Sequence, residues 1–314
     1  MSTMTRPNTL KQGDRLAVLC GSSPTSASAE ALSAAVRMMG LEPVLYPSAT
    51  AKHGYLSGTD AIRAADLNAA FADDSIAGIV CTRGGYGFHR VLPLLDWKVI
   101  RNHPKFFGGY SDVTAMLNAL NSIGMMESYH MPMVSAWFGD QADREPKELD
   151  AYSMSFVKAM LFGEETEYDN PEGFPRQTLV SGKAKGRLCG GNLSLMAASI
   201  GTPYEIDTKG KILFIEEVHE EPYSVDGMLT QLRNSGKLDD AAGILLGNFT
   251  DCEEAGEKKT GLTLDQIFEE LIAPAGKPTI LGVQCGHSTP TLSLPMGRTF
   301  QMDANACTFG PVKK

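Results

Sequence analysis

The most informative part of the sequence is Phe106-Phe107-Gly108-Gly109-Tyr110-Ser111-Asp112-Val113-Thr114-Ala115. In it an apolar strand runs into two glycines, and a helix-like sequence follows at once. A serine at such a tight turn exposes its hydroxyl beside the unpaired N–H groups of the next helix. Ser111 is therefore a candidate nucleophile, although Val113 stands where G-x-S-x-G has its last glycine. The alternative is that Ser111 or Asp112 only caps the helix.

The same alternation of strand and helix extends through the first half of the chain. Short apolar runs separated by Ala-rich amphipathic stretches predict a mostly parallel sheet covered by helices on both faces. Sites in such sheets lie at the carboxyl ends of the strands. The expected strands are Leu16–Cys20, Pro43–Tyr46, Ile76–Cys81 and Lys105–Gly109, with helices at Ala29–Met39 and Asp60–Ala72.

A change of composition divides the chain. The stretch from about Asp140 to Gly182 is rich in Glu, Asp, Pro and Gly, with a helix expected near Lys147–Leu161. We predict an N-terminal α/β domain over residues 1–165, a linker over 166–182 and a C-terminal domain over 183–314. The expected elements of the C-terminal domain are strands Lys211–Ile215, Gly243–Leu246 and Thr279–Gly282, helices Leu193–Ile200, Val225–Leu232 and Leu264–Leu271, and short strands from Thr291 on.

Composition and net charge exclude some classes of function. The chain has 314 residues, of which 43% are hydrophobic and 21% charged, as in ordinary globular proteins. Its formal net charge of −9 argues against broad binding to nucleic acid, which needs a basic surface. No apolar run approaches the length of a membrane span, and the polar N-terminus does not resemble a secretion signal. We therefore expect a cytoplasmic protein with no membrane partner, whose six cysteines are small buried hydrophobic residues.

A glycine-rich loop, Thr82-Arg83-Gly84-Gly85-Tyr86-Gly87, follows another predicted strand. It matches neither G-x-G-x-x-G nor a phosphate loop, so a nucleotide site is weakly supported. The N–H of Gly84 or Gly85 could pair with the N–H of Asp112 to form an oxyanion hole. Arg83 suits a substrate carboxylate because its guanidinium can bind one bidentately. A plain glycine turn, and an Arg83 paired with an acid of the fold, are the alternatives.

Two further motifs supply an acid and a base. The strand Lys211–Ile215 ends in Glu216 and Glu217, and a carboxylate at a strand end can orient an imidazole. The strand before Gly286 leads to His287. A solvated acidic loop and a structural histidine are the alternatives. The histidines show no zinc-ligand spacing, so no metal site and no cofactor are predicted.

The motifs resemble, in order and over nearly the whole chain, the LD-carboxypeptidase family of serine peptidases, which includes muramoyltetrapeptide carboxypeptidases. The stretches that carry the resemblance are Cys20-Gly21-Ser22-Ser23-Pro24, Arg83-Gly84-Gly85-Tyr86-Gly87, Gly109-Tyr110-Ser111-Asp112-Val113-Thr114, Gly190-Gly191-Asn192-Leu193, Gly201-Thr202-Pro203, Ile212-Leu213-Phe214-Ile215-Glu216-Glu217, Glu221-Pro222-Tyr223, Gly286-His287 and Leu294-Pro295-Met296-Gly297.

The resemblance implies a catalytic triad of Ser111, His287 and Glu216, with Glu217 as the alternative acid. It also implies an N-terminal domain like class I glutaminases, a smaller C-terminal α+β domain, a cytoplasmic homodimer and no metal. The implied reaction removes the terminal D-alanine from murein tetrapeptides in cell-wall recycling by cutting an L–D amide bond. We assign the oxyanion hole to Gly85 and Asp112, and substrate contacts to Arg83, Gly84 and Tyr110.

Three alternatives remain open at this point. The microcin C self-immunity peptidases of the same family act on aminoacyl-nucleotide-like amides. Cys189 replaces a tryptophan usual in the family, and Ser224 and Gly227 replace arginines, so the substrate is the open question. An α/β-hydrolase esterase shares the order serine, acid, histidine along the chain but has G-x-S-x-G. A non-catalytic peptide- or sugar-binding module is the third alternative.

Overall fold

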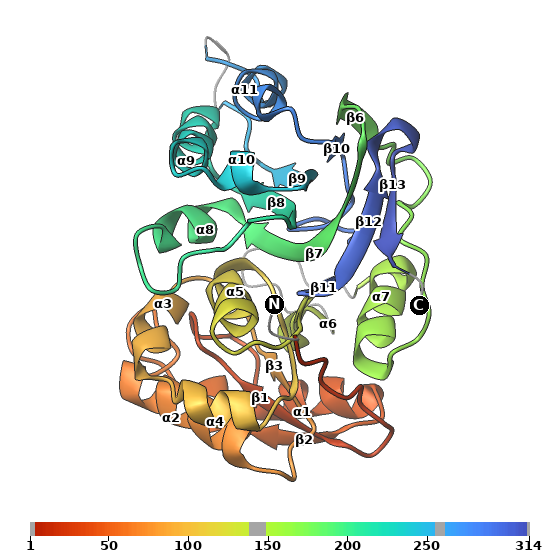
Figure 1. Cartoon of the computed structure of the whole chain (residues 1–314). Helices are drawn as coiled ribbons and strands as arrows, with labels where there is room; N and C mark the ends of the chain where they lie inside the picture. Colours follow the sequence, from red (N-terminus) through yellow and green to blue (C-terminus); the bar gives the residue numbers. More distant parts are fainter. Residues whose placement is uncertain (1–3, 138–148, 255–260, 313–314) are drawn as a thin grey trace. The chain divides into compact units, whose positions relative to one another are not determined.

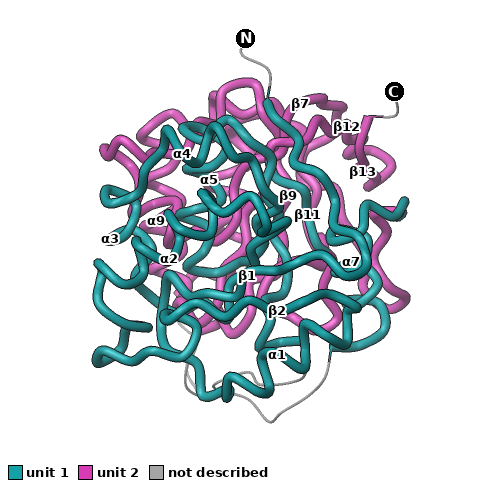
Figure 2. Tube along the Cα trace, turned by 90° about the horizontal axis from the view of Figure 1, so that it is seen from below, with its two compact units in different colours: residues 1–166, 293–296 teal, residues 167–292, 297–314 magenta. Residues whose placement is uncertain are grey.

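The computed structural model describes residues 4–137, 149–254 and 261–312. The chain forms two compact units, shown in different colours in Figure 2. Unit 1 comprises residues 1–166 and 293–296, and unit 2 comprises residues 167–292 and 297–314. The chain thus passes between the units at Thr166 and Glu167, and a four-residue segment near the C-terminus belongs to unit 1.

Unit 1 is built on a six-stranded sheet in the order β11-β5-β4-β3-β1-β2. All neighbours pair in parallel except β11 and β5, so the predicted α/β class is confirmed. The four strands expected from the apolar runs are present and almost wholly buried except β2. The strands are β1 (Arg15–Leu19), β2 (Glu42–Leu45), β3 (Gly78–Cys81), β4 (Phe106–Gly109), β5 (Ser128–His130) and β11 (Leu294–Met296).

The strand order of unit 1 places its functional loops together. The chain runs from β1 outward to β2 and then back to β3 on the other side of β1, so the order reverses between β1 and β3. Ligands bind at such a reversal, outside the carboxyl ends of the strands. The loops that leave β1, β3 and β4 here are 20–24, 82–87 and 110–113. The last two are the loops that the sequence singled out.

Local signals explain the helices of unit 1. The hydroxyls of Ser28 and Thr59 accept from backbone N–H groups in the first turns of α1 and α2. The helix expected near Lys147–Leu161 begins at 151, because the Asp150 carboxylate caps it, and ends at Gly163 in the left-handed region; residues 147 and 148 lie outside the described residues. The helices, labelled in Figure 1, are α1 (Ala29–Met38), α2 (Asp60–Ala72), α3 (Phe88–Val91), α4 (Trp97–Asn102), α5 (Thr114–Ser122), α6 (Val134–Trp137) and α7 (Ala151–Phe162).

Unit 2 contains a seven-stranded mixed sheet in the order β13-β12-β7-β8-β9-β10-β6. Its centre, β7 to β10, is parallel, while β6, β12 and β13 pair antiparallel at the two sides. The predicted α+β character is confirmed. The strands are β6 (Gln177–Val180), β7 (Lys183–Asn192), β8 (Ile212–Val218), β9 (Gly243–Thr250), β10 (Thr279–Leu281), β12 (Thr299–Asp303) and β13 (Thr308–Pro311).

The helices of unit 2 bury one face of the central strand β8. Leu213 and Ile215 belong to a core cluster that includes buried side chains of α8, α9 and α11. Because side chains alternate along a strand, Phe214 and Glu216 project from the opposite face. The face from which a side chain projects therefore decides whether Glu216 or Glu217 is available to His287. The helices are α8 (Leu193–Ser199), α9 (Pro222–Asn234), α10 (Lys237–Asp240) and α11 (Leu264–Leu271).

Four strands depart from the elements expected from sequence, and one of them is β5, where no strand was expected. β6 lies inside the segment 166–182 that we expected to be a linker. β7 begins with alternating polar residues and contains three glycines, which are unfavourable in strands, so its sequence gave no strand signal. β11 pairs with β5 in unit 1 although it follows most of unit 2 in the chain. Pairings of this kind depend on distant contacts that no local pattern encodes.

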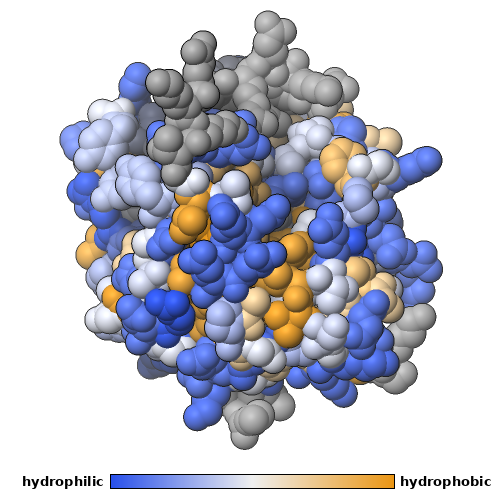
Figure 3. Space-filling view, turned by 90° about the horizontal axis from the view of Figure 1, so that it is seen from above, coloured by the Kyte–Doolittle hydropathy of each residue, from blue (hydrophilic) through white to orange (hydrophobic). Residues whose placement is uncertain are grey.

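The described helices include none that is long and apolar enough to cross a membrane. On the face drawn in Figure 3, hydrophobic residues form small patches separated by hydrophilic ones. The six cysteines are free thiols, and all but the half-buried Cys307 are buried. This agrees with the expectation that they act as small hydrophobic side chains.

Candidate active site

The backbone at the end of β4 presents Ser111 in an unusual conformation. Tyr110 is extended, and Ser111 itself has a φ of 62°, in the left-handed region that non-glycine residues seldom adopt. A short 3₁₀ turn, Ser111–Val113, then leads into α5. Tyr110 occupies the N-cap position of that turn, so neither Ser111 nor Asp112 is a simple helix cap. Strained residues of this kind cluster at functional sites.

Gly84 approaches the Ser111 side chain closely. A Cβ added to Gly84 would lie 2.8 Å from Ser111 Cβ and 2.9 Å from its Oγ. Both contacts are closer than real Cβ atoms tolerate, so any side chain at position 84 would displace the serine. Gly85 has a φ of 113°, which other residues rarely adopt. The glycines of this loop are therefore required both by close approach and by backbone conformation.

The Asp112 side chain is buried and binds the two neighbouring loops. Its carboxylate accepts from Ser22 Oγ at 2.6 Å and from the Phe88 N–H at 2.9 Å, and it also accepts from the Gly87 N–H. Burial raises the pKa of this carboxyl in spite of these donors. The side chain therefore acts within the loops, while its backbone N–H remains the predicted oxyanion donor. Ser22 belongs to one of the stretches that carry the family resemblance, and the structure adds its bond to Asp112.

Arg83, in the glycine loop, and Tyr110, directly before Ser111, are each half-buried. One Arg83 guanidinium nitrogen donates to the backbone oxygen of Pro24 at 3.3 Å. A guanidinium has five N–H donors, so this single bond leaves donors for a ligand. The Tyr110 ring packs edge-on against His130, with ring centroids 5.8 Å apart. Their predicted contacts with substrate stay predictions.

In unit 2, the two adjacent glutamates at the end of β8 have different partners. Glu216 is fully buried and its Oε2 lies 2.7 Å from His287 Nδ1. Glu217, on the helix-facing side, accepts from Asn192 Nδ2 and from the Ser194 N–H, both at 2.7 Å. Burial raises the pKa of the Glu217 carboxyl. The carboxylate bound to the imidazole is therefore Glu216.

The loop that carries His287 is held on both sides. A Cβ on Gly286, whose φ is 130°, would lie 2.8 Å from Glu216 Oε2, so only glycine allows this approach. On the other side, Ser288 Oγ donates to Asn248 Oδ1 at 2.7 Å. When Nδ1 carries the proton shared with Glu216, Nε2 is the acceptor nitrogen of the neutral ring. Gly286 belongs to a motif that carries the family resemblance, and the structure adds the close approach that requires a glycine there.

The predicted site residues therefore fall into two groups. Within unit 1, the structure places Gly84 against Ser111 and joins Asp112 to the loop that contains Gly85 and Arg83. Within unit 2, it joins Glu216 to His287. The predicted triad of Ser111, His287 and Glu216, and the oxyanion hole, stay predictions. Among the described residues, no group of three or more His, Cys, Asp and Glu side chains could hold a metal ion.

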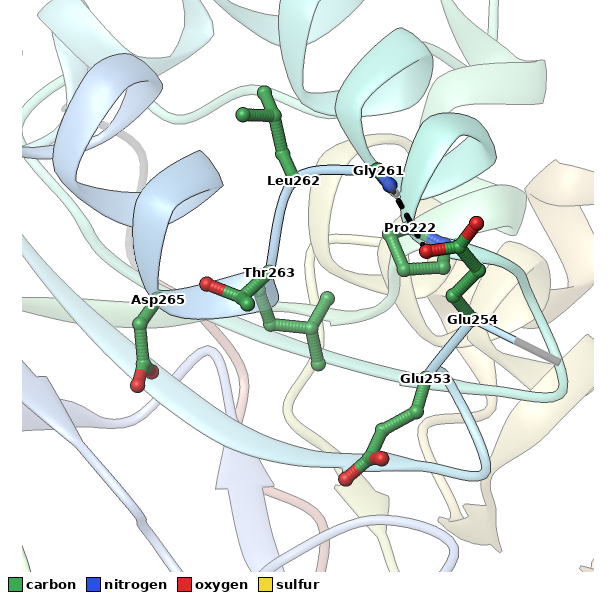
Figure 4. Close-up of a pocket in the computed structure, with 8 residues that line it drawn as sticks. Pro222, Glu253, Glu254, Gly261, Leu262, Thr263 and Asp265 are labelled. Carbon is green, nitrogen blue, oxygen red and sulfur yellow. Dashed lines mark hydrogen bonds between the residues drawn. The ribbon is translucent and has the colours of Figure 1, made fainter. Parts of the chain in front are cut away.

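A pocket in unit 2 has different chemistry from the predicted site (Figure 4). It is lined by Pro222, Glu253, Glu254 and residues 261–265, and the Glu254 carboxylate accepts from the Gly261 N–H at 2.9 Å. Its three acidic side chains would repel an anionic substrate. None of the predicted catalytic residues lines this pocket.

The fold and these two groups define a class of protein. Serine acyl-transfer enzymes have two such features. One is a serine on a strained turn after a parallel strand, and the other is a buried carboxylate bound to a histidine. Comparison of the sequence with known protein families indicates the same class of enzyme. Residues 16–131 match the model of the LD-carboxypeptidase N-terminal domain, and residues 185–302 match that of the C-terminal domain. The chain belongs to the LD-carboxypeptidase family, which confirms the resemblance.

Individual relatives agree with this assignment. The chain is 39% identical to a probable murein peptide carboxypeptidase of Bacillus subtilis, over 95% of this chain and 91% of that protein. It is 32% identical to the murein tetrapeptide carboxypeptidase of Pseudomonas aeruginosa, over 90% of this chain and 92% of that protein. The chain is therefore a peptidase.

Solved structures show the same fold. The muramoyltetrapeptide carboxypeptidase of Oxalobacter formigenes superposes with a TM-score of 0.77 at 26% identity, over 93% of this chain and 97% of that chain. The microcin C7 self-immunity protein MccF, in complex with glutamyl sulfamoyl guanosine, gives a TM-score of 0.85 at 22% identity, with 98% of each chain covered. At that identity the likeness to MccF concerns the fold alone.

Proposed function

We propose that this peptidase removes the terminal D-alanine from murein tetrapeptide by cleaving an L–D amide bond in cell-wall recycling. The observation that carries the proposal is the hydrogen bond between buried Glu216 and His287, because it provides an oriented base for a serine nucleophile. The names of the B. subtilis and P. aeruginosa relatives support the choice of a murein peptide as the substrate.

In the proposed mechanism Ser111 Oγ attacks the scissile carbonyl carbon while His287 Nε2 takes its proton. The tetrahedral intermediate collapses, the C–N bond breaks, and His287 gives the proton to the leaving amine of D-alanine. Water then attacks the acyl-serine ester, again losing a proton to His287, and releases the tripeptide acid and Ser111. Glu216 holds the imidazole and stabilises its cationic form.

Backbone donors complete the proposed site. The N–H groups of Gly85 and Asp112 stabilise the oxyanion, each worth about 3–4 kcal/mol in comparable enzymes. The close contact of Gly84 with Ser111 supports this role, because it brings the glycine loop beside the nucleophile. Arg83 binds the free carboxylate of the terminal D-alanine, and Gly84 and Tyr110 line the substrate path. The proposed reaction uses no metal or cofactor.

MccF supports a second candidate function. Solved structures of MccF contain aminoacyl sulfamoyl nucleosides. This chain is 26% identical to the Escherichia coli protein, over 79% of this chain and 77% of that protein. An amide hydrolase with the same residues would act on such conjugates if its binding surface accepted a nucleoside. The higher identity to the murein enzymes favours the peptide substrate.

A side-by-side assay tests the choice between the two substrates. The purified enzyme is incubated with a free murein tetrapeptide and, separately, with aspartyl sulfamoyl adenosine, and products are followed by mass spectrometry. We expect release of D-alanine with a kcat/KM at least 100-fold above that for the nucleoside conjugate. The reverse preference would make the chain a detoxifying hydrolase, and ligand returned intact in both assays would make it a binding module.

The carboxylate-binding role of Arg83 has its own test. Arg83→Ala should raise KM about 10-fold for the tetrapeptide with a free C-terminus and leave KM for its C-terminal amide within about twofold, because only the former loses a charge-assisted bond. Equal effects on both substrates would remove Arg83 from this role.

We further propose that the enzyme works in the cytoplasm as a homodimer. The family resemblance supports both points. Light scattering after size-exclusion chromatography would test the oligomeric state, with an expected mass near twice that of one chain. Fractionation of cells that express the tagged protein would test its location. A monomer, or a protein found outside the cytoplasmic fraction, would contradict the corresponding part of the proposal.

A further inference from the structure

One peptide bond in the glycine loop is held at both ends by buried charges. The carbonyl oxygen of Gly87 accepts from Arg63 Nη1 at 3.1 Å. The N–H of the same peptide unit, which belongs to Phe88, donates to Asp112 Oδ2 at 2.9 Å. A cation on the oxygen end and an anion on the nitrogen end together fix the orientation of the peptide plane.

The same two side chains also bind the loop that leaves β1. Arg63 Nη1 donates to the carbonyl oxygen of Gly21, and Ser22 Oγ donates to Asp112 Oδ2 at 2.6 Å. The loops after β1 and β3 are thus fixed to one another at the point where the strand order of unit 1 reverses. Asp112 directly follows Ser111, so the network reaches the nucleophile turn.

Both charged side chains are deeply buried, so holding the loop in this way costs desolvation free energy. The Arg63 side chain is fully inaccessible and Asp112 is 1% exposed. Buried ions are destabilising unless they are paired and hydrogen-bonded, and apolar side chains of similar size often stabilise a fold as well or better. Gly87, with a φ of 136°, admits no other residue, since a Cβ there would collide with Arg63 Nη1. The arrangement therefore specifies a geometry rather than supplying stability alone.

We propose that Arg63 and Asp112 are positioning residues, a peptide clamp that holds loop 82–87 with the N–H of Gly85 toward the oxyanion formed at Ser111. Gly84 lies against Ser111, so a small rotation of the loop would both disturb the nucleophile and turn the donor of Gly85 away. This inference rests on the proposed function, because it concerns the oxyanion donors of that reaction.

Lys105 offers a matched control. It is also a buried cation that donates to two backbone oxygens, those of Asp73 at 2.7 Å and Ile76 at 2.8 Å. These groups precede β3 and β4, at the amino ends of the strands, opposite the serine turn. Arg63→Met removes one buried cation from two carbonyl oxygens and also from the Asp60 carboxylate, with which Arg63 forms an ion pair. Lys105→Met removes one buried cation from two carbonyl oxygens, so a general loss of stability affects both variants.

The experiment compares kcat and KM of the two variants on the tetrapeptide. We expect Arg63→Met to lower kcat about 10- to 100-fold, with KM within about threefold, because a misplaced donor acts in the transition state. Lys105→Met should lower the melting temperature and leave kcat within twofold. Wild-type kcat in folded Arg63→Met, or an equal fall in kcat in Lys105→Met, would overturn the proposal.

Amide hydrogen exchange gives a readout that does not depend on turnover. Peptides covering residues 82–91 should exchange at least 10-fold faster in Arg63→Met and at the wild-type rate in Lys105→Met. Unchanged exchange in Arg63→Met would overturn the clamp even if activity fell. If the enzyme hydrolyses no murein peptide, the proposed function fails while this measurement still decides the clamp. If Arg63→Met does not fold, Asp112→Asn takes its place under the same criteria.

Discussion

The serine turn of unit 1 and the carboxylate–imidazole pair of unit 2 are built in different ways. Ser111 is presented by backbone conformation, within ten consecutive residues that run from a buried strand into a helix. Glu216 and His287 are joined by a side-chain hydrogen bond between residues 71 positions apart. The first group is a local structure, and the second depends on how β8 and the loop after β10 are placed within the sheet. Sequence patterns therefore predict the serine turn more directly than the carboxylate–imidazole pair.

The largest effect should follow removal of the hydroxyl from the local group. Ser111→Ala should lower kcat on the tetrapeptide by about 10⁴-fold or more, because covalent catalysis is lost while binding remains. Circular dichroism and the melting temperature should match those of the wild type. A folded Ser111→Ala variant with more than about a tenth of wild-type activity would show that the serine turn is structural.

The long-range group can be tested by comparing the two neighbouring glutamates. Glu216→Gln should lower kcat about 10³- to 10⁴-fold, because the amide would no longer stabilise the imidazolium of His287. Glu217→Gln, on the other face of β8, should change kcat less than about 10-fold. Steady-state kinetics of both variants provides the measurement. Equal losses, or a larger loss in Glu217→Gln, would reassign the acid of the triad.

A smaller effect should follow from crowding the serine. Gly84→Ala places a methyl group 2.8 Å from Ser111 Cβ, so we expect kcat to fall about 10- to 100-fold as the nucleophile shifts. Gly310→Ala is the matched control, since a Cβ at Gly310, in β13, meets no atom within 4 Å. Its kcat should stay within twofold of wild type. Full activity in Gly84→Ala would show that the close approach is not needed.

The smallest effect concerns stability against pH. Burial raises the pKa of the Glu217 carboxyl in the folded state, so this group binds its proton more tightly there than in the unfolded chain. Its contribution to the free energy of unfolding therefore falls as pH rises from the ordinary glutamate pKa through the raised one. Glu217→Gln should remove that slope in urea unfolding measured across this pH window. An unchanged slope would assign the pH dependence to other groups.

Much of unit 1 was predictable for a physical reason. Buried parallel strands are continuous apolar runs, and β1, β3 and β4 carry that pattern beside helices with their own caps. In contrast, β7 is a strand because distant partners supply its hydrogen bonds, although its own residues favour no strand. β11 lies among the short strands expected from Thr291 on, but its pairing with β5 in unit 1 was not predicted. The glycine loop was identified from its composition, but its contacts with Ser23 and Ser111 were not.

By itself, the sequence determined the α/β class, the serine turn and the membership of a peptidase family, because each depends on patterns within short stretches of neighbouring residues. Only the tertiary structure decided between Glu216 and Glu217, since side-chain alternation along β8 gives them opposite faces and only one face meets His287. It also brought Arg63 and Asp112, 49 positions apart, to the two ends of one peptide bond. Burial and hydrogen-bond geometry of this kind arise from the packed chain, and no local pattern specifies them.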